Sequence, residues 1–271
     1  MKNALRSELR KIMTTRLWWI LAIVMFAYMA FLGAVMAFSF TVDADGDSMA
    51  VGLASGGVLD GQAVAQAVYT LGNSLGYVFP LVIGALAMTS EFRHQTITPT
   101  LLHEPRRSVM LAAKLVSHLL LGIVYGVVGT AGAVAMGAPV LAFAGDGTFL
   151  SDPEIIRGIV LSVVALAIWC VIGVGLGTVL PNQIASVVVI LAFTQFIEPI
   201  LRIGFGAVDA LSGVAKFFPG AAAEALVGSS LYSETGLLEL LSHWQGAAVL
   251  MTYALGFALI GRFTTLRKDI S

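Results

Sequence analysis

Long stretches without a charged residue constrain the fold of this chain more than any other feature. Five windows lack Asp, Glu, Lys and Arg: 26 residues follow Arg16, 30 follow Asp60, 31 follow Lys114, 40 follow Arg157 and 22 follow Glu239. A helix of about 20 apolar residues crosses a hydrocarbon core of about 30 Å. Only 11% of the 271 residues are charged, against about 25% in soluble domains. The pattern excludes a soluble enzyme, a disordered chain and a nucleic-acid-binding protein, and it indicates a multi-span membrane protein.

The windows predict an all-α membrane protein with six transmembrane helices, because Pro181, Asn182 and Gln183 divide the longest window in two. The predicted spans are roughly 17–40, 66–89, 110–136, 156–180, 184–203 and 243–262. The fifth span is the weakest, since only residues 184–197 are uncharged, about 21 Å of helix. Its last turns contain Glu198 and Arg202, which share a helix face and can pair. A screened ion pair at the membrane interface and a charged pair at the outer mouth of a pathway both remain open.

The positions of the basic residues predict the orientation. Twelve of the fifteen Lys and Arg residues lie before the first span, between the second and third spans, or after the sixth. With six spans, all three groups lie on one side of the membrane. The positive-inside rule assigns that side to the cytoplasm. We therefore expect a multi-pass protein of the plasma membrane with both termini cytoplasmic.

Three segments outside the spans carry further expectations. In residues 1–15, apolar residues recur at helical spacing and basic residues occupy the other face, which predicts an amphipathic helix in the cytoplasmic interface. Residues 41–65 are acidic and glycine-rich and predict an external loop; their three alternate Asp residues lack the full spacing of a calcium loop. Residues 204–242 are apolar but interrupted by glycines and Pro219. This last pattern predicts external re-entrant or interface-lying helices.

No motif for catalysis or for nucleotide binding is present. The sequence lacks a GxxxxGK[ST] loop, and its four His residues and single Cys170 do not form a metal-ligand spacing. The five clear spans lack a carboxylate near their centres, which disfavours a proton relay. Small residues instead suggest close helix packing, and they include Gly122, Gly126, Gly129, Gly132, Gly173, Gly175 and Gly177. We expect no catalytic residue, metal site or bound cofactor in this chain.

The polar segment between the second and third spans carries a resemblance to a known family. Its residues are Glu91, Phe92, Arg93, His94, Gln95, Thr96 and Ile97, followed by Thr98, Pro99, Thr100, Leu101 and Leu102 and then by Pro105, Arg106 and Arg107. This segment resembles the loop of ABC-2-type permease subunits of ABC transporters, especially those of actinobacteria. The resemblance extends over the whole chain, 1–271, as a single transmembrane permease domain.

The resemblance implies one half of an ATP-driven exporter. Two permease chains, identical or different, would pair side by side, and separate ATP-binding-cassette ATPase subunits would dock beneath them and use ATP and Mg²⁺. Segment 90–109 would contain the coupling helix. Residues 91–97 would contact the ATPase, so this chain would not itself be an enzyme. The family does not fix the transported substrate.

Polar and aromatic residues of the second and fifth spans are candidates to line the substrate pathway. They are Tyr69, Asn73, Tyr77 and Phe79 in the second span and Thr194, Gln195 and Phe196 in the fifth. The first three recur at every fourth residue and predict one helical stripe, which suits helix packing as well as substrate contact. The scarcity of charge within the spans suggests a hydrophobic or amphipathic substrate. An ion-coupled secondary transporter and a membrane-embedded enzyme are the alternatives.

Overall fold

The computed structural model describes all residues except 43–60, 145–146, 207–212, 230–239 and 268–271. Every regular element of the described residues is a helix, which confirms the all-α prediction. The elements are α1 (Lys2–Thr14), α2 (Leu17–Val42), α3 (Gly61–Tyr69), the 3₁₀ turn η2 (Leu71–Asn73), α4 (Val78–Arg93), α5 (Ile97–His103), α6 (Arg107–Ala144), α7 (Pro153–Val179), α8 (Gln183–Ala192), the π-helical turn η3 (Phe193–Ile197), α9 (Glu198–Gly206), α11 (Pro219–Val227) and α12 (His243–Thr264).

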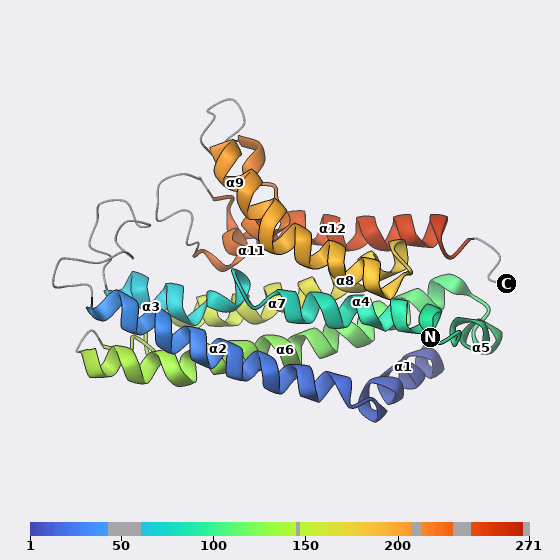
Figure 1. Ribbon diagram of the computed structural model, residues 1–271, viewed down its shortest axis with the longest axis horizontal. Helices are drawn as coiled ribbons and strands as arrows, with labels where there is room; N and C mark the ends of the chain where they lie inside the picture. Colours follow the sequence, from blue (N-terminus) through green and yellow to red (C-terminus); the bar gives the residue numbers. More distant parts are fainter. Residues whose placement is uncertain (43–60, 145–146, 207–212, 230–239, 268–271) are drawn as a thin grey trace.

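The long helices lie side by side in one bundle (Figure 1). Helix α7 is the central element, because it packs against α4, α6 and α12, and α2 packs on the other side of α6. Trp169 and Cys170 of α7 are completely or almost completely buried. The start of α1 and the end of α12 lie at the same end of the bundle, together with α5. We refer to this end as the N/C end.

Five helices of the described chain are long and apolar enough to cross a membrane. They are Leu17–Thr41, Arg107–Ala144, Pro153–Val179, Gln183–Gly206 and His243–Thr264. The chain is therefore a multi-pass helical membrane protein, and these helices coincide with five of the six predicted spans. The third predicted span, 110–136, was too short, since α6 has 38 residues and continues through Pro139.

The second predicted span, 66–89, is not one helix, and the prediction of a continuous helix was wrong. The α-helix ends with α3, the chain then forms the 3₁₀ turn η2, and α-helical geometry resumes in α4. Pro80 lies in the first turn of α4, where its missing N–H is tolerated, but it cannot donate to the carbonyl of Gly76 four residues earlier. Gly76 is also packed closely, because a side chain there would meet the Sδ of Met29 at 2.7 Å.

Glycines set the distance between the central helices, as the small-residue pattern predicted. A methyl group at Gly84 of α4 would lie 2.0 Å from the carbonyl oxygen of Cys170. A methyl group at Gly173 of α7 would lie 2.1 Å from the carbonyl oxygen of Leu81. The backbones of α4 and α7 therefore touch directly, which gives dense van der Waals contact where lipid offers no hydrophobic driving force.

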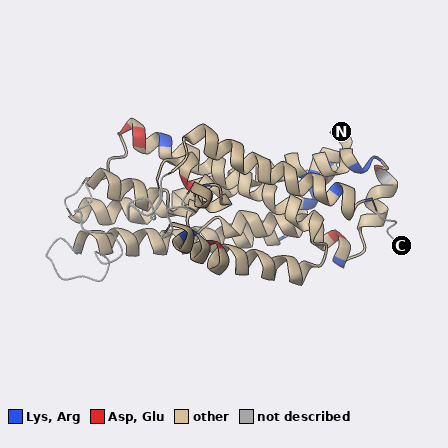
Figure 2. Ribbon diagram, turned by 90° about the horizontal axis from the view of Figure 1, so that it is seen from above, with Lys and Arg blue, Asp and Glu red and all other residues tan. Residues whose placement is uncertain are grey.

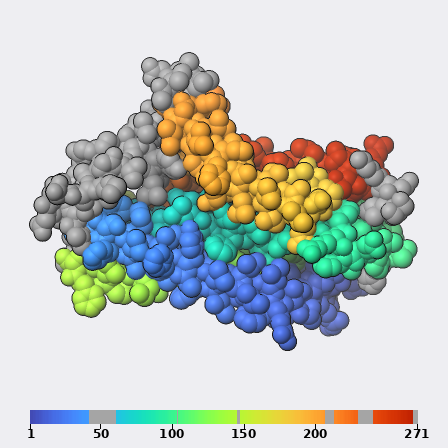
Figure 3. All heavy atoms as spheres, in the orientation of Figure 1, coloured from blue at the N-terminus to red at the C-terminus, as the bar shows by residue number. Residues whose placement is uncertain are grey.

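The fifth span contains an irregular turn. Helix α8 passes through η3 into α9 without an end, and η3 has π-helical hydrogen bonding. The backbone carbonyl of Thr194 in such a turn would bond to the N–H five residues later, but that residue is Pro199 and has none. A proline next to a π turn is a recognised cause of a bend. Helices α8 and α9 form a ridge that stands out from the bundle (Figure 3).

The segments outside the spans agree in part with expectation. Helix α1 is present, and it presents Arg6 and Arg10 outward while Ala4 and Glu8 are buried. Within the predicted external segment 204–242, α11 is a short helix with all nine residues buried, packed against α12 and α7. The three Asp residues of loop 41–65 lie outside the described residues.

Candidate functional site

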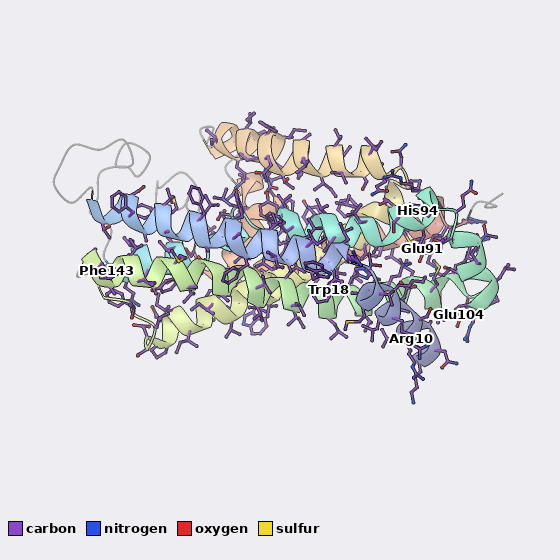
Figure 4. All side chains as sticks on the ribbon, turned by 60° about the horizontal axis from the view of Figure 1, so that its bottom comes forward. Arg10, Trp18, Glu91, His94, Glu104 and Phe143 are labelled. Carbon is purple, nitrogen blue, oxygen red and sulfur yellow. The ribbon has the colours of Figure 1, made fainter. Side chains whose placement is uncertain are left out.

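Four charged side chains, three of them buried, form a cluster at the N/C end. Lys114 Nζ of α6 donates to Glu8 Oε2 of α1 at 2.8 Å and to Glu91 Oε1 of α4 at 2.7 Å. Lys11 Nζ of α1 donates to Glu8 Oε1 at 2.8 Å and to Glu91 Oε1 at 2.7 Å. It also donates to Thr100 Oγ1 of α5 at 3.3 Å. This four-charge cluster therefore joins α1, α4, α5 and α6, and Figure 4 shows Glu91 where α4 ends beside α1.

Charge compensation within the four-charge cluster offsets the cost of burial. The side chains of Glu8, Glu91 and Lys114 are 6%, 6% and 1% exposed, whereas that of Lys11 is 42% exposed. Burial acts to raise the pKa of Glu8, but Lys114 and Lys11 outweigh it and hold that pKa below its ordinary value. Burial acts to lower the pKa of Lys11, but hydrogen bonds to Glu8 and Glu91 outweigh it and raise that pKa. Glu8 and Lys11 are therefore both charged at neutral pH.

The turn between α4 and α5 is fixed by backbone hydrogen bonds. The Thr96 N–H donates to the Glu91 carbonyl at 2.9 Å, and the Gln95 N–H donates to the Phe92 carbonyl at 3.2 Å. This pair of bonds is the Schellman motif, with Gln95 in the left-handed conformation at φ 55°. Gly usually occupies this position, but here the residue is Gln95, so the sequence carried no local signal for the end of α4. Ile97 is buried and anchors the start of α5.

The residues expected to contact an ATPase therefore fall into an exposed group and a group that is half-buried or buried. The exposed ones are Arg93, His94, Gln95 and Thr96, while Phe92 is half-buried and Glu91 and Ile97 are buried. The Arg93 guanidinium donates to Gln183 Oε1 at 3.1 Å and so links this turn to the start of α8. The role of the exposed group in docking stays a prediction. The burial of Glu91 gives that residue an internal contact that sequence reasoning missed, because its partners are Lys114 and a residue 80 positions away, Lys11.

The predicted pathway residues of the second and fifth spans meet at one point. The Tyr77 hydroxyl donates to the Thr194 carbonyl at 3.0 Å, and the Tyr77 ring lies 4.4 Å from that of Trp169. Both Tyr77 and Thr194 are buried, whereas Gln195 and Phe196 face outward from the ridge. This contact joins the interrupted second span to the π turn of the fifth.

The other pathway candidates do not share one stripe. The Tyr69 hydroxyl donates to the Thr148 carbonyl at 2.8 Å, near the end of the bundle opposite the N/C end. Asn73 is buried in η2, and Phe79 contacts the ring of Tyr28 at 5.7 Å. The expectation of a single stripe was wrong, because it required the continuous helix that the break between α3 and α4 removes.

A second buried cluster contains the charged pair of the fifth span. The Arg202 guanidinium donates to both carboxylate oxygens of Glu224 on α11, and Ser74 Oγ donates to Glu224 Oε1 at 3.1 Å. Glu198 Oε1 accepts from the Gly220 N–H at 2.6 Å. Glu198, Arg202 and Glu224 are at most 4% exposed, so solvent does not screen these three charges. Sequence spacing missed Glu224, and the available signal was a single acid with three apolar residues on each side, 221–223 and 225–227.

No group of three or more His, Cys, Asp or Glu residues suited to a metal ion occurs within the described part of the chain. The thiol of Cys170 is buried and unpaired with another cysteine. A comparison of the sequence with protein-family models found no match, and a comparison with curated proteins found none. The geometry of the described residues therefore carries the argument about function.

Proposed function

We propose that this chain is the permease subunit of an ATP-binding-cassette exporter, in which two permease chains form the substrate pathway and separate ATPase subunits supply the energy. The resemblance of residues 91–107 to ABC-2-type permeases motivates the proposal. In this reading α3, η2 and α4 together make the sixth crossing. The start of α1 and the end of α12 lie at one end of the bundle, which supports an even number of crossings.

The single observation that carries the proposal is the four-charge cluster beneath α5. It fixes α1, α4 and α6 to one another and leaves Arg93, His94, Gln95 and Thr96 exposed beside it. A force applied to this exposed surface would reach the long helices directly, because the four-charge cluster, and not a flexible loop, connects them. That is the requirement for coupling ATP binding to a change between two conformations of the pathway.

The charge distribution supports a cytoplasmic position for the N/C end. Lys and Arg concentrate at this end of the bundle (Figure 2). This agrees with the positive-inside rule and with a plasma-membrane protein whose termini are both cytoplasmic. We refer to the exposed residues Arg93, His94, Gln95 and Thr96 as the docking surface. With this orientation, the docking surface faces the compartment that contains ATP.

The ridge of α8, η3 and α9 supports pairing with a second permease chain. Its large apolar side chains Ile184, Phe196 and Ile200 are 73%, 66% and 67% exposed. The Tyr77–Thr194 contact lies just behind this ridge and links it to α4, whose other end carries the docking surface. A movement of α4 would therefore reach the interface between the two chains, where a hydrophobic or amphipathic substrate would pass.

The test uses the full chain, purified from its native membrane with an affinity tag and reconstituted in nanodiscs. We expect an ATP-binding-cassette ATPase to co-purify and its hydrolysis rate to depend on the permease. Arg93→Ala with His94→Ala should reduce both co-purification and coupled hydrolysis. The matched control is Arg10→Ala, which removes an exposed cation of α1 on the same end of the bundle. A stable chain without any such ATPase would overturn the proposal.

An ion-coupled secondary transporter is the second candidate. The observation that favours it is the buried Glu198–Arg202–Glu224 cluster, which contains two carboxylates and one guanidinium. Buried carboxylates in membrane proteins often mark ion or proton pathways. Proteoliposomes that contain the chain alone distinguish the two candidates, because only this second candidate predicts uptake driven by a proton gradient without ATP.

A further inference from the structure

The exposed face of α1 carries only basic charges. Lys2, Arg6 and Arg10 are exposed and recur at every fourth residue, so they form one stripe along the helix. The one acid in the sequence of α1 is Glu8, which is buried and accepts from Lys114 on the other side of the helix. We refer to Lys2, Arg6 and Arg10 as the basic stripe.

The basic stripe has no counter-charge within the described part of the chain. Three described acids lie at the N/C end, and each already has its own cations. Glu8 and Glu91 belong to the four-charge cluster, and Glu104 pairs with Arg106 at 2.9 Å. Three exposed like charges on one helix face create a positive potential that attracts an anionic partner from outside the chain.

The basic stripe lies beside the start of a membrane span. The span of α2 begins at Leu17, after a connection of two residues from α1. Tyr125 of α6 donates to the main-chain carbonyl of Trp18 at 2.7 Å, whereas Lys114 of α6 donates to Glu8 at 2.8 Å. About 16 Å of helix separates these two residues of α6. Helix α1 therefore follows α6 outward from the start of the span, through the headgroup layer.

Apolar side chains continue the exposed surface at the inner end of the basic stripe. Met13 follows Arg10 by three residues on the same face and is 71% exposed, and Leu17 and Trp19 are 41% and 43% exposed. Tryptophan is enriched where hydrocarbon meets the headgroups. An acidic protein would pair with the basic stripe but would leave Met13 in water. A lipid leaflet with anionic headgroups offers negative charge and hydrocarbon in the order that this surface requires.

The basic stripe is separate from the docking surface. Figure 4 shows Arg10 on α1 apart from His94 at the end of α4. The side of α1 that approaches α4 and α5 carries Lys11, which donates to Glu91 and to Thr100. An ATPase bound to the docking surface would therefore leave the basic stripe available to another partner.

We infer that the basic stripe binds the anionic headgroups of phospholipids in the leaflet next to the N/C end. The guanidinium groups of Arg6 and Arg10 and the ammonium of Lys2 pair with phosphates, while Met13 contacts the acyl chains. The surface potential of such a leaflet decays over about 8 Å at physiological ionic strength. The contribution of each cation therefore decreases from Arg10 to Lys2. This binding does not depend on the proposed transport function, since it requires only α1 and its place beside the span.

The experiment measures quenching of tryptophan fluorescence by brominated lipids in proteoliposomes of the full chain. Trp244→Phe removes the exposed indole of α12, and Trp169 is buried, so quenching reports on Trp18 and Trp19 beside the basic stripe. Dibrominated phosphatidylglycerol is compared with dibrominated phosphatidylcholine at equal mole fractions. We expect a relative association constant of about fivefold in favour of phosphatidylglycerol, as one headgroup held by one cation implies. Equal quenching by the two lipids would overturn the inference.

Variants of exposed residues locate the binding. Arg6→Gln with Arg10→Gln should remove most of the preference for phosphatidylglycerol. The matched control is Arg106→Gln with Arg267→Gln, which removes two exposed cations of the same end outside α1 and should preserve the preference. An equal loss in the two double variants would refute the location.

The depth of each cation gives a further test. Arg10→Gln alone should lower the preference more than Lys2→Gln alone, and the reverse order would contradict the assigned position of the basic stripe. The variant with all three residues changed to Gln also separates a lipid from a protein partner. If it lost a co-purifying ATPase but retained the preference for phosphatidylglycerol, the basic stripe would be a protein contact and the inference would be wrong.

Discussion

The hydroxyl of Tyr77 donates a hydrogen bond to the main-chain carbonyl of Thr194, a residue 117 positions later in the sequence. In the π-helical turn η3 that carbonyl would bond to the N–H of residue 199, which is a proline. Tyr77 thus supplies the donor that Pro199 cannot. This one hydrogen bond therefore links the break before α4 to the π turn between α8 and α9.

Replacement of Tyr77 by phenylalanine should lower the free energy of unfolding by about 1 kcal/mol, since it leaves a buried carbonyl without this donor. The measurement is unfolding of the purified chain in mixed micelles. Tyr28→Phe is the matched control, because Tyr28 lies in α2, is 38% exposed and contacts the same segment through Phe79. Equal effects of the two changes would contradict the role assigned to the Tyr77 hydroxyl.

Replacement of Lys114 by methionine should cost about 3 to 5 kcal/mol of stability, because it leaves Glu8 and Glu91 buried with only Lys11 to compensate them. Adding Glu8→Gln to this variant should recover part of the loss. The same unfolding assay gives the double-mutant cycle. The control is Arg106→Ala, which removes an exposed partner of Glu104 and should leave stability unchanged. No recovery in the double variant would argue against direct coupling of Lys114 and Glu8.

The attachment of α1 to the bundle should depend on pH only at the extremes. The folded pKa of Glu8 lies below 4.5, so its stabilisation is present above 4.5 and is lost as the pH falls through the folded pKa. The folded pKa of Lys11 lies above 10.5, so its contribution is present below 10.5 and is lost as the pH rises through the folded pKa. A spin label at Arg6→Cys reports α1 selectively, since Cys170 is buried. Its mobility should be constant between these limits, and a transition near neutral pH would contradict the assignment.

Replacement of Gly84 by alanine should destabilise the chain by several kcal/mol, about the upper end of what overpacking costs. The added methyl group would lie 2.0 Å from a carbonyl oxygen of α7, and the two helices would have to separate. Gly256→Ala in α12 is the matched control, because nothing lies within 4 Å of a methyl group there. It should be neutral or slightly stabilising, as expected from helix propensity. Thermal unfolding in detergent compares the two variants.

Local sequence patterns were sufficient for much of the fold. A charge-free window must be buried in lipid or protein whichever helices pack beside it, so five spans were predictable. The clustering of basic residues at one end followed from their positions between the spans. The glycines of α6 and α7 likewise predicted close helix packing, because the absence of a side chain permits it in any arrangement. The break between α3 and α4 was not predictable from hydropathy, since an apolar segment scores equally whether it is straight or interrupted.

The sequence by itself determined that this chain is a helical membrane protein and which residues of its polar loop are candidates for docking. Only the tertiary structure decided which charges meet: Glu8 with Lys114, 106 residues apart, and Arg202 with Glu224 on a short buried helix. The physical reason is that hydropathy depends on each residue's own transfer free energy. An ion pair instead depends on the distance between two side chains, which is fixed by how the helices pack and by the direction in which each one runs.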